Sequence, residues 1–144
     1  MKLFVYLHLK NAAAAISFYE AAFGAREIYR LTEPGGTRIG HAELDFEGTK
    51  VMLADEFPEF GVKGPEAIGG TPVTVQLQVE NADALVDRAV KAGATLERPV
   101  EDQFYGDRSG TIRDPFGHRW NIAHRIEDVS PTEMQRRWNE MAAG

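Results

Sequence analysis

Histidine and glutamate lie two positions apart in the segment Gly40–Phe46, at His41 and Glu43. On an extended strand, residues two apart share one face, about 7 Å from each other along the chain. An imidazole and a carboxylate placed in this way can act as a general base and its partner. They can equally form a hydrogen-bonded pair on a partly solvated strand face. Both interpretations stay open, and His41 and Glu43 are the candidate catalytic residues.

A second group of residues can hold a small polar ligand. Arg108 can bind a carboxylate or a phosphate, and Tyr105 can stack or donate a hydrogen bond. A local ion pair between Asp107 and Arg108 that fixes the loop is the alternative. The other candidate binding residues are His8, Gln76, Gln78 and Asn121. The amides suit recognition of a neutral polar group, but water can bridge them instead.

Alternating strands would position these side chains. In Arg38–Phe46, the residues Ala42, Leu44 and Phe46 share one face, and His41, Glu43 and Asp45 share the other. The segments Leu3–Leu9 and Val73–Val79 alternate in the same way. Asp114-Pro115-Phe116-Gly117 predicts a tight turn between the last two strands. Trp120 is expected in the core, where its indole N–H needs a partner.

One pattern occurs twice along the chain. A strand, an Asn-Ala pair, a helix and a Gly-Ala pair follow one another at Asn11 to Gly24 and again at Asn81 to Gly93. Asparagine is a good helix N-cap, and glycine is the usual residue after a helix end. We therefore expect a βαβββ unit that is used twice.

The predicted fold class is α+β, with two tandem βαβββ modules forming a curved mixed sheet around a cavity, plus a short C-terminal helix. The whole chain, 1–144, is expected to be one domain. It divides into a first module (1–56), a linker (57–71), a second module (72–125) and a C-terminal extension (126–144). Ser130-Pro131-Thr132-Glu133 is a capping box for the last helix. A stripe of Met134, Trp138 and Met141 on that helix should pack on the body or on a second subunit.

Bulk composition limits the partners. The formal net charge is −6, which argues against nucleic acid or an anionic membrane surface. The chain has no cysteine and no apolar run that approaches the roughly 20 residues of a membrane span. We therefore expect a cytoplasmic protein that binds neither nucleic acid nor a membrane. The polar strand faces favour a small-molecule ligand, and the stripe of Met134, Trp138 and Met141 favours a homodimer.

The sequence resembles a known family, the vicinal oxygen chelate superfamily. This superfamily includes glyoxalase I, extradiol dioxygenases and bleomycin and fosfomycin resistance proteins. The resemblance is carried by the doubled βαβββ pattern, by Ile16-Ser17-Phe18-Tyr19 with Phe23-Gly24-Ala25, and by Asp114-Pro115-x-Gly117. The segments GHAEL, MLADE, GGTPV and FYGDR are similar to the PhnB-like branch of that superfamily.

The resemblance also implies where a metal would be bound. Enzymes of the superfamily usually hold a divalent cation with His and Glu side chains, one from each of four strand positions. Those positions correspond here to Phe4, Leu53, Thr74 and Asn121. Phenyl and aliphatic side chains cannot ligate a cation, and neutral oxygens are weak ligands. No metal is therefore expected at the usual site, and no other cofactor is expected.

Three hypotheses follow for the function. The first is a protein without the usual metal ligands that binds a small polar organic molecule in the sheet cavity. The second is an enzyme of the lyase, isomerase or dioxygenase type, using acid–base chemistry through His41 and Glu43 or a metal site rebuilt from His8, His41 and Glu43. The third is a non-catalytic dimeric module.

Overall fold

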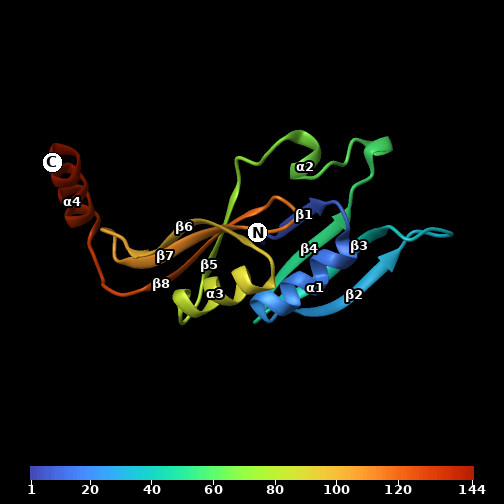
Figure 1. Cartoon of the computed structure of the whole chain (residues 1–144), viewed down its shortest axis with the longest axis horizontal. Helices are drawn as coiled ribbons and strands as arrows, with labels where there is room; N and C mark the ends of the chain where they lie inside the picture. The colour runs from blue at the N-terminus through green and yellow to red at the C-terminus, as the bar shows by residue number, and fades with distance from the viewer.

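The computed structural model describes all residues from 1 to 144. The first module consists of β1 (Val5–Leu9), α1 (Ala12–Phe23), β2 (Arg26–Thr32), β3 (Ile39–Phe46) and β4 (Thr49–Asp55). A connector follows with the 3-10 turn η1 (Pro58–Phe60) and the short α2 (Pro65–Ile68). The second module consists of β5 (Thr74–Gln78), α3 (Ala82–Ala92), β6 (Thr95–Asp102), β7 (Asp107–Arg113) and β8 (Arg119–Arg125). The chain ends with α4 (Pro131–Ala143), at one end of the elongated molecule (Figure 1).

The strands form two separate four-stranded sheets with the same topology. Their orders are β1-β4-β3-β2 and β5-β8-β7-β6. In each sheet the first strand of the module pairs parallel with the last, and the other pairings are antiparallel. The α+β class and the doubled βαβββ unit are thus confirmed. No helix combines the length and apolar character needed to cross a membrane.

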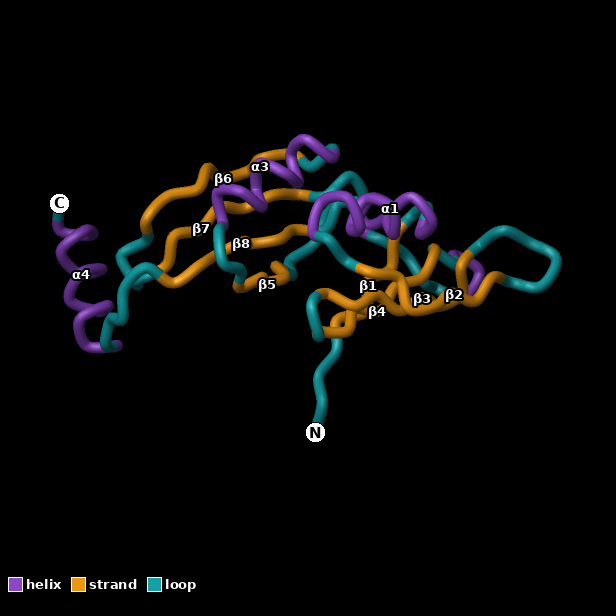
Figure 2. The backbone as a smooth tube through the Cα atoms, turned by 90° about the horizontal axis from the view of Figure 1, so that it is seen from below, coloured by secondary structure: helices purple, strands orange, loops and turns teal.

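Helices α1 and α3 cover the same side of the two sheets and leave the opposite strand faces uncovered (Figure 2). Alternating strand residues such as Leu7, Leu44 and Leu53 pack under the helices. One cluster of 22 buried residues runs through both modules, so they share a single hydrophobic core.

The aromatic residues of α1 join the two modules. Phe23 contacts Trp120 of β8 with ring centroids 5.0 Å apart, and Phe46 of β3 stacks on the same indole at 5.9 Å. Trp120 and Tyr19 are completely buried. The core position predicted for Trp120 is therefore correct.

The buried carboxylate of Asp114 is the polar centre of this junction. Its Oδ2 accepts from the Tyr19 hydroxyl at 2.6 Å and from the Trp120 indole N–H at 2.9 Å. Its Oδ1 accepts from the backbone N–H groups of Phe116 and His118, at 2.9 and 3.0 Å. Burial and the nearby Asp114 raise the pKa of Tyr19 well above its usual value, so the phenol keeps the proton that it donates.

The predicted turn lies between β7 and β8. Gly117 donates its N–H to the Asp114 carbonyl at 3.1 Å and has a φ of 96°, a conformation that favours glycine. A Cβ on Gly117 would come within 2.8 Å of the Pro65 side chain, so the turn also needs glycine to let the connector approach. The His118 ring then reaches the first module, where Nε2–H donates to the His8 carbonyl at 3.0 Å.

The two helix starts are fixed in parallel ways. The Asn11 and Asn81 side chains accept from the backbone N–H groups of Ala14 and Ala84. The first helical N–H of α1 is bound by Asp55 at 2.7 Å, and that of α3 is bound by His124 Nδ1 at 2.9 Å. Each acceptor comes from the end of the strand that pairs with the module's first strand.

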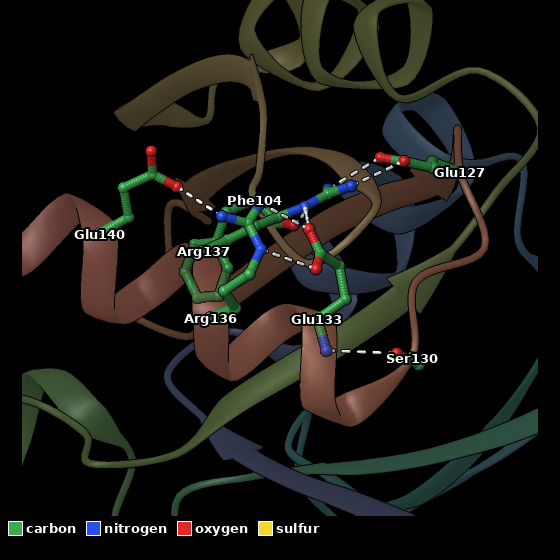
Figure 3. Close-up of polar contacts among 7 residues, drawn as sticks. All are labelled: Phe104, Glu127, Ser130, Glu133, Arg136, Arg137 and Glu140. Atoms are coloured by element: carbon green, nitrogen blue, oxygen red, sulfur yellow. Dashed lines mark hydrogen bonds and ion pairs between the residues drawn. The ribbon is translucent and has the colours of Figure 1, made fainter.

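Helix α4 is attached to the body mainly by polar contacts (Figure 3). Arg137 pairs with Glu127 at 2.8 Å and donates to the Phe104 carbonyl at 2.9 Å. None of the residues of α4 is buried, and the Trp138 ring lies 6.0 Å from that of Phe104. Of the apolar stripe predicted for this helix, Trp138 and Met141 are thus exposed on the chain, and Met134 is half-buried.

We predict that Asp114→Asn lowers the free energy of unfolding by about 3 kcal/mol, because an amide cannot accept from all four buried donors. Urea denaturation measures this loss. Asp87→Asn is the matched control, since Asp87 makes an exposed pair with Lys91 and should change stability by less than about 0.5 kcal/mol. Equal urea midpoints for the two variants would show that the Asp114 cluster contributes little.

We predict that Arg137→Ala releases α4 from the body. The nuclear Overhauser contacts between Phe104 and Trp138 should disappear, and protease cleavage within 126–144 should accelerate. Arg136→Ala is the control, because Arg136 bonds only to Glu133 and Glu140 inside the helix. If the Phe104–Trp138 contacts persist in Arg137→Ala, the ion pairs do not hold the helix.

Candidate functional site

Each sheet presents one uncovered face, opposite its helix. We call the uncovered face of the first sheet the first open face. Its members are found from strand alternation and register: Tyr6, His8, Tyr29, Leu31, His41, Glu43, Lys50 and Met52. The uncovered face of the second sheet is the second open face: Thr74, Gln76, Gln78, Ser109, Thr111, Arg119 and Asn121.

A connected hydrogen-bond network crosses the first open face. The Tyr6 hydroxyl lies 2.8 Å from His41 Nδ1, and His41 Nε2 lies 2.9 Å from Glu43 Oε2. The same carboxylate accepts from the Tyr29 hydroxyl at 3.0 Å and pairs with Lys50 at 2.9 Å. The four strands of the sheet each supply one or more of these groups. The pairing of His41 with Glu43 that their spacing suggests is therefore present.

The donors around Glu43 decide how the protons are arranged. Hydrogen bonds from His41, Lys50 and Tyr29 lower the pKa of Glu43 to about 2, with His41 contributing most. An ionised carboxylate only accepts, so His41 carries its proton on Nε2 and leaves Nδ1 as an acceptor. The Tyr6 hydroxyl then donates to Nδ1. Glu43 is thus a poor proton acceptor at neutral pH, and its chemical effect is to orient and charge-stabilise His41.

His8 lies beside this network and makes no hydrogen bond to it. Its ring centroid is 4.9 Å from that of Tyr6. Nδ1 of His8 is buried without a hydrogen-bond partner. Burial, followed by the charge of His118, lowers the pKa of His8. The expected position of His8 near His41 is correct in so far as both flank Tyr6.

Amide and hydroxyl groups form a hydrogen-bonded chain on the second open face. Thr111 donates to the Asn121 carbonyl oxygen at 3.3 Å, Asn121 donates to Gln76 at 2.6 Å, and Gln76 donates to Gln78 at 2.8 Å. The predicted residues Gln76, Gln78 and Asn121 are thus brought together in one amide chain. Both glutamines are exposed to solvent.

An open groove of about 500 Å³ lies over this amide chain. Tyr105 lines the groove, as do Gln76, Asn121 and Arg119. Arg119 is held by Glu97 at 3.2 Å and by the Thr71 carbonyl at 3.1 Å. Tyr105 therefore joins the amide residues, and Arg119 and Arg98 are the cations that adjoin them.

Arg108 lies elsewhere, which corrects its expected grouping with the other candidates. It belongs to β7 rather than to a preceding loop, and it pairs in register with His124 on the helix side. Its guanidinium binds both carboxylate oxygens of Asp83 in α3, at 2.7 and 2.8 Å, and Asp102 at 2.9 Å. The local pair of Asp107 with Arg108 is also wrong, because Asp107 pairs with Arg125.

The two open faces can be compared position by position, since the modules repeat. Tyr6 and Gln76 hold equivalent places opposite Met52 and Asn121, respectively. His41 and Glu43 correspond to Ser109 and Thr111, which lie opposite Ala123 and Asn121. The first open face therefore carries aromatic and titratable groups at places where the second carries neutral amides and hydroxyls.

Two βαβββ modules with uncovered sheet faces define the class of fold, and comparison with known proteins identifies the family. The family model "Glyoxalase/Bleomycin resistance protein/Dioxygenase superfamily" matches residues 5–122. The chain belongs to this superfamily.

The chain also has relatives with near full-length similarity. An uncharacterized protein of Mycobacterium tuberculosis is 42% identical over 142 residues, covering 96% of this chain and 83% of the relative. The crystal structure of TioX from Micromonospora sp. ML1 is 30% identical with a TM-score of 0.68, covering 88% of this chain and 99% of TioX. A Pseudomonas aeruginosa protein, PA1353, has a TM-score of 0.71 at 22% identity, covering 88% of this chain and 99% of that one, which supports the fold alone.

The residues at the superfamily's usual metal positions do not fit a divalent cation. Phe4 has no donor atom, and Thr74 and Asn121 offer only neutral oxygens. Leu53 is completely buried under the helix, so the open-face residues of β4 are Lys50 and Met52 instead. They supply neither imidazole nor carboxylate.

The metal site considered from His8, His41 and Glu43 is not formed. Both ring nitrogens of His41 are already engaged, by Tyr6 and by Glu43. No group of three or more His, Asp or Glu side chains in the chain is arranged to hold a metal ion.

Sequence reasoning missed Tyr6, Tyr29 and Lys50. Tyr6 alternates with Leu7 like His8, so its face could be predicted, but its contact with His41 crosses the intervening β4. Tyr29 meets Glu43 through a register that contains irregularities between β2 and β3. No local pattern in the sequence encodes that register.

We predict a pH-dependent stability difference between the native protein and Glu43→Gln. The folded pKa of Glu43 is depressed from 4.5 to about 2, so its stabilisation is present above pH 4.5 and is lost as the pH falls toward 2. The gap between the urea midpoints of the two proteins should therefore shrink over that range. Tyr29→Phe removes one donor and should shift the loss to slightly higher pH. A gap that stays constant from pH 6 to 2 would show that the carboxylate is not held in this way.

Proposed function

We propose that this protein binds a small polar organic molecule on its open sheet faces. The observation that supports this is the pair of uncovered faces, whose polar and aromatic side chains are organised in networks rather than replaced by apolar residues. A face with only a structural duty would carry Val, Ile or Leu. Tyr6 and Tyr29 remain 39% and 41% exposed beside the charged network, which suits contact with a flat ligand group.

A second copy of the chain would complete the site. Both open faces lie on the side away from α1 and α3, so neither covers the other within one chain (Figure 2). A homodimer that opposes the first open face of one subunit to the second open face of its partner would enclose a cavity. One wall would then supply rings and charge, and the other would supply amides and hydroxyls. The exposed Trp138 and Met141 of α4 add apolar surface for such an association.

The ligand chemistry follows from these two walls. Rings flanking an imidazole favour an aromatic or unsaturated group. The Gln76–Asn121 chain offers donors and acceptors to a carbonyl, an amide or a hydroxyl. Metal-dependent lyase or dioxygenase chemistry is not favoured, because the donor set does not fit a divalent cation. A purely structural dimer with an empty cavity is the alternative that the experiment must separate from binding.

We predict that at least one compound in a panel of ring-containing metabolites and antibiotics raises the melting temperature by several degrees. Tyr29→Ala and Asn121→Leu should each weaken that compound's binding roughly tenfold, through lost ring contact and lost hydrogen bonds. Asp87→Asn, on the outer face of α3, is the control and should bind normally. Sedimentation of the same samples should show a dimer at micromolar concentration.

The outcomes separate the two parts of the proposal. A panel without any melting shift contradicts ligand binding and favours the structural dimer. A monomer in sedimentation that still binds contradicts closure by a second copy. Binding that survives both face variants shows that the ligand lies elsewhere.

A further inference from the structure

Three side chains of the first open face stand in line for proton transfer: the Tyr6 hydroxyl, the His41 imidazole and the Glu43 carboxylate. We propose that they form a relay in which the Tyr6 oxygen removes a proton from a bound ligand whose C–H is acidified by a neighbouring carbonyl or heteroaromatic ring. This inference rests on the proposed binding of a ligand to that face. It assigns Tyr6 as the group that touches the reacting atom.

The Glu43 carboxylate sets the direction of the relay. An ionised carboxylate only accepts, so the His41 Nε2–H donates to it across 2.9 Å and Nδ1 is left to accept from the Tyr6 hydroxyl across 2.8 Å. The order is a hydroxyl, then a base, then a group that orients the base and stabilises its charged form, which is the arrangement that activates hydroxyl groups in many enzymes. Glu43 is held as an anion by Tyr29 and Lys50 in addition to His41. An imidazolium formed at His41 would therefore have a permanent counter-charge.

The fold does not require these groups, as the second module shows. At the equivalent places it has Gln76, Ser109 and Thr111, none of which titrates near neutral pH. Helix-facing residues of the same strands are apolar at equivalent places in both modules, as for Leu7 and Leu77 and for Leu44 and Ile112. The second sheet therefore forms without a Tyr-His-Glu set. Folding alone thus does not explain why Tyr6, His41 and Glu43 are present in the first sheet.

Access to the hydroxyl is consistent with this role. Tyr6 is 39% exposed on an uncovered face, whereas Tyr19, the structural tyrosine, is completely buried. Burial, followed by the charge of Glu43, raises the pKa of Tyr6, so the phenol is protonated at rest and reacts only with transfer of its proton to His41. A resting tyrosinate is thus not part of the mechanism.

The step balances without any further reactant. The ligand C–H bond breaks and its electron pair stays on the ligand as an enolate or an equivalent anion. The proton forms a new O–H bond at Tyr6 while the former Tyr6 proton moves to His41 Nδ1. Return of a proton to the same or a neighbouring ligand atom restores the relay, so the reaction class is proton exchange or isomerisation.

A probe that reports base strength tests the relay directly in the full-length protein. In 5-nitrobenzisoxazole, loss of the ring C–H proton to a base breaks the N–O bond and gives the coloured 2-cyano-4-nitrophenolate. The native protein should catalyse this elimination above the buffer rate. Tyr6→Phe and His41→Ala should lower the catalysed rate roughly 100-fold, in line with the loss of general-base catalysis.

Matched variants separate the relay from simple packing. Glu43→Gln should lower the rate at least tenfold, whereas Glu27→Gln, which removes a β2 carboxylate paired with Arg30, should leave it unchanged. The catalysed rate of the native protein should fall on acidification, because the relay removes a proton from the ligand. The other titratable groups facing the relay are His8 of β1, Tyr29 of β2 and Lys50 of β4, with His118 next to His8, and Tyr6→Phe should abolish the pH dependence.

Binding of the product, 2-cyano-4-nitrophenol, is followed by NMR shifts at first-open-face residues in the same proteins. Binding together with elimination that Tyr6→Phe does not slow, or with no elimination, overturns the relay and leaves the proposed binding function intact. Absence of binding counts against both. Binding with elimination that depends on Tyr6, His41 and Glu43 establishes the relay.

Discussion

The buried carboxylate of Asp114 is the interaction on which the arrangement of this protein depends. A carboxylate withdrawn from water is stable only when its oxygens are satisfied, and here four donors converge on it. Tyr19 comes from α1 of the first module, and Trp120 comes from β8 of the second. The Asp-Pro-Phe-Gly turn supplies the two backbone donors. One residue therefore closes a turn and also locks the two repeats at a defined angle.

This lock has a consequence for the open faces. Because α1 packs against α3 and also places Tyr19 and Phe23 on Trp120 of β8, both helices lie on one side of the molecule and both sheets turn their other side outward. The polar strand faces are thus left without cover by the same contacts that build the core. A ligand, a second copy or solvent must satisfy the hydrogen-bonding groups of these faces. The hydrogen bonds within each face lower the free-energy cost of leaving those groups without such a partner.

Much of this architecture could be predicted from local pattern. The alternation of Ala42 and Leu44 with His41 and Glu43 predicted both faces of β3, and the Asn and Gly signals predicted the ends of α1 and α3. The errors arose where a shift of one residue along a strand changed the face on which a side chain lies. Starting β7 after Arg108 rather than at Asp107 placed Arg108 in a binding loop, and a shift of one on β4 placed Leu53 on the open face. Because side chains alternate along a strand, each such shift moves a residue to the opposite face of the sheet.

The contacts of the site that could not be predicted from the sequence are those between strands. Tyr6 and His41 are separated by 35 positions and lie on strands that do not pair with each other, since β4 runs between them. Only the assembled register of three strands brings the hydroxyl to the imidazole. Likewise, the sequence predicted that the Trp120 N–H needs an acceptor. That the acceptor is Asp114 depended on the geometry of the turn.

The doubled module makes it possible to separate what the fold needs from what it does not. Places that serve the fold have kept their physical roles in both copies: asparagine caps, a side-chain acceptor for the first helical N–H at Asp55 and His124, and apolar residues under the helices. The places on the open faces have not. Tyr6, His41 and Glu43 occupy the places that Gln76, Ser109 and Thr111 occupy in the other copy. Since both copies fold, the difference between them at these three places is chemical rather than structural: a phenol, an imidazole and a carboxylate of the first sheet stand where the second sheet has an amide and two hydroxyls.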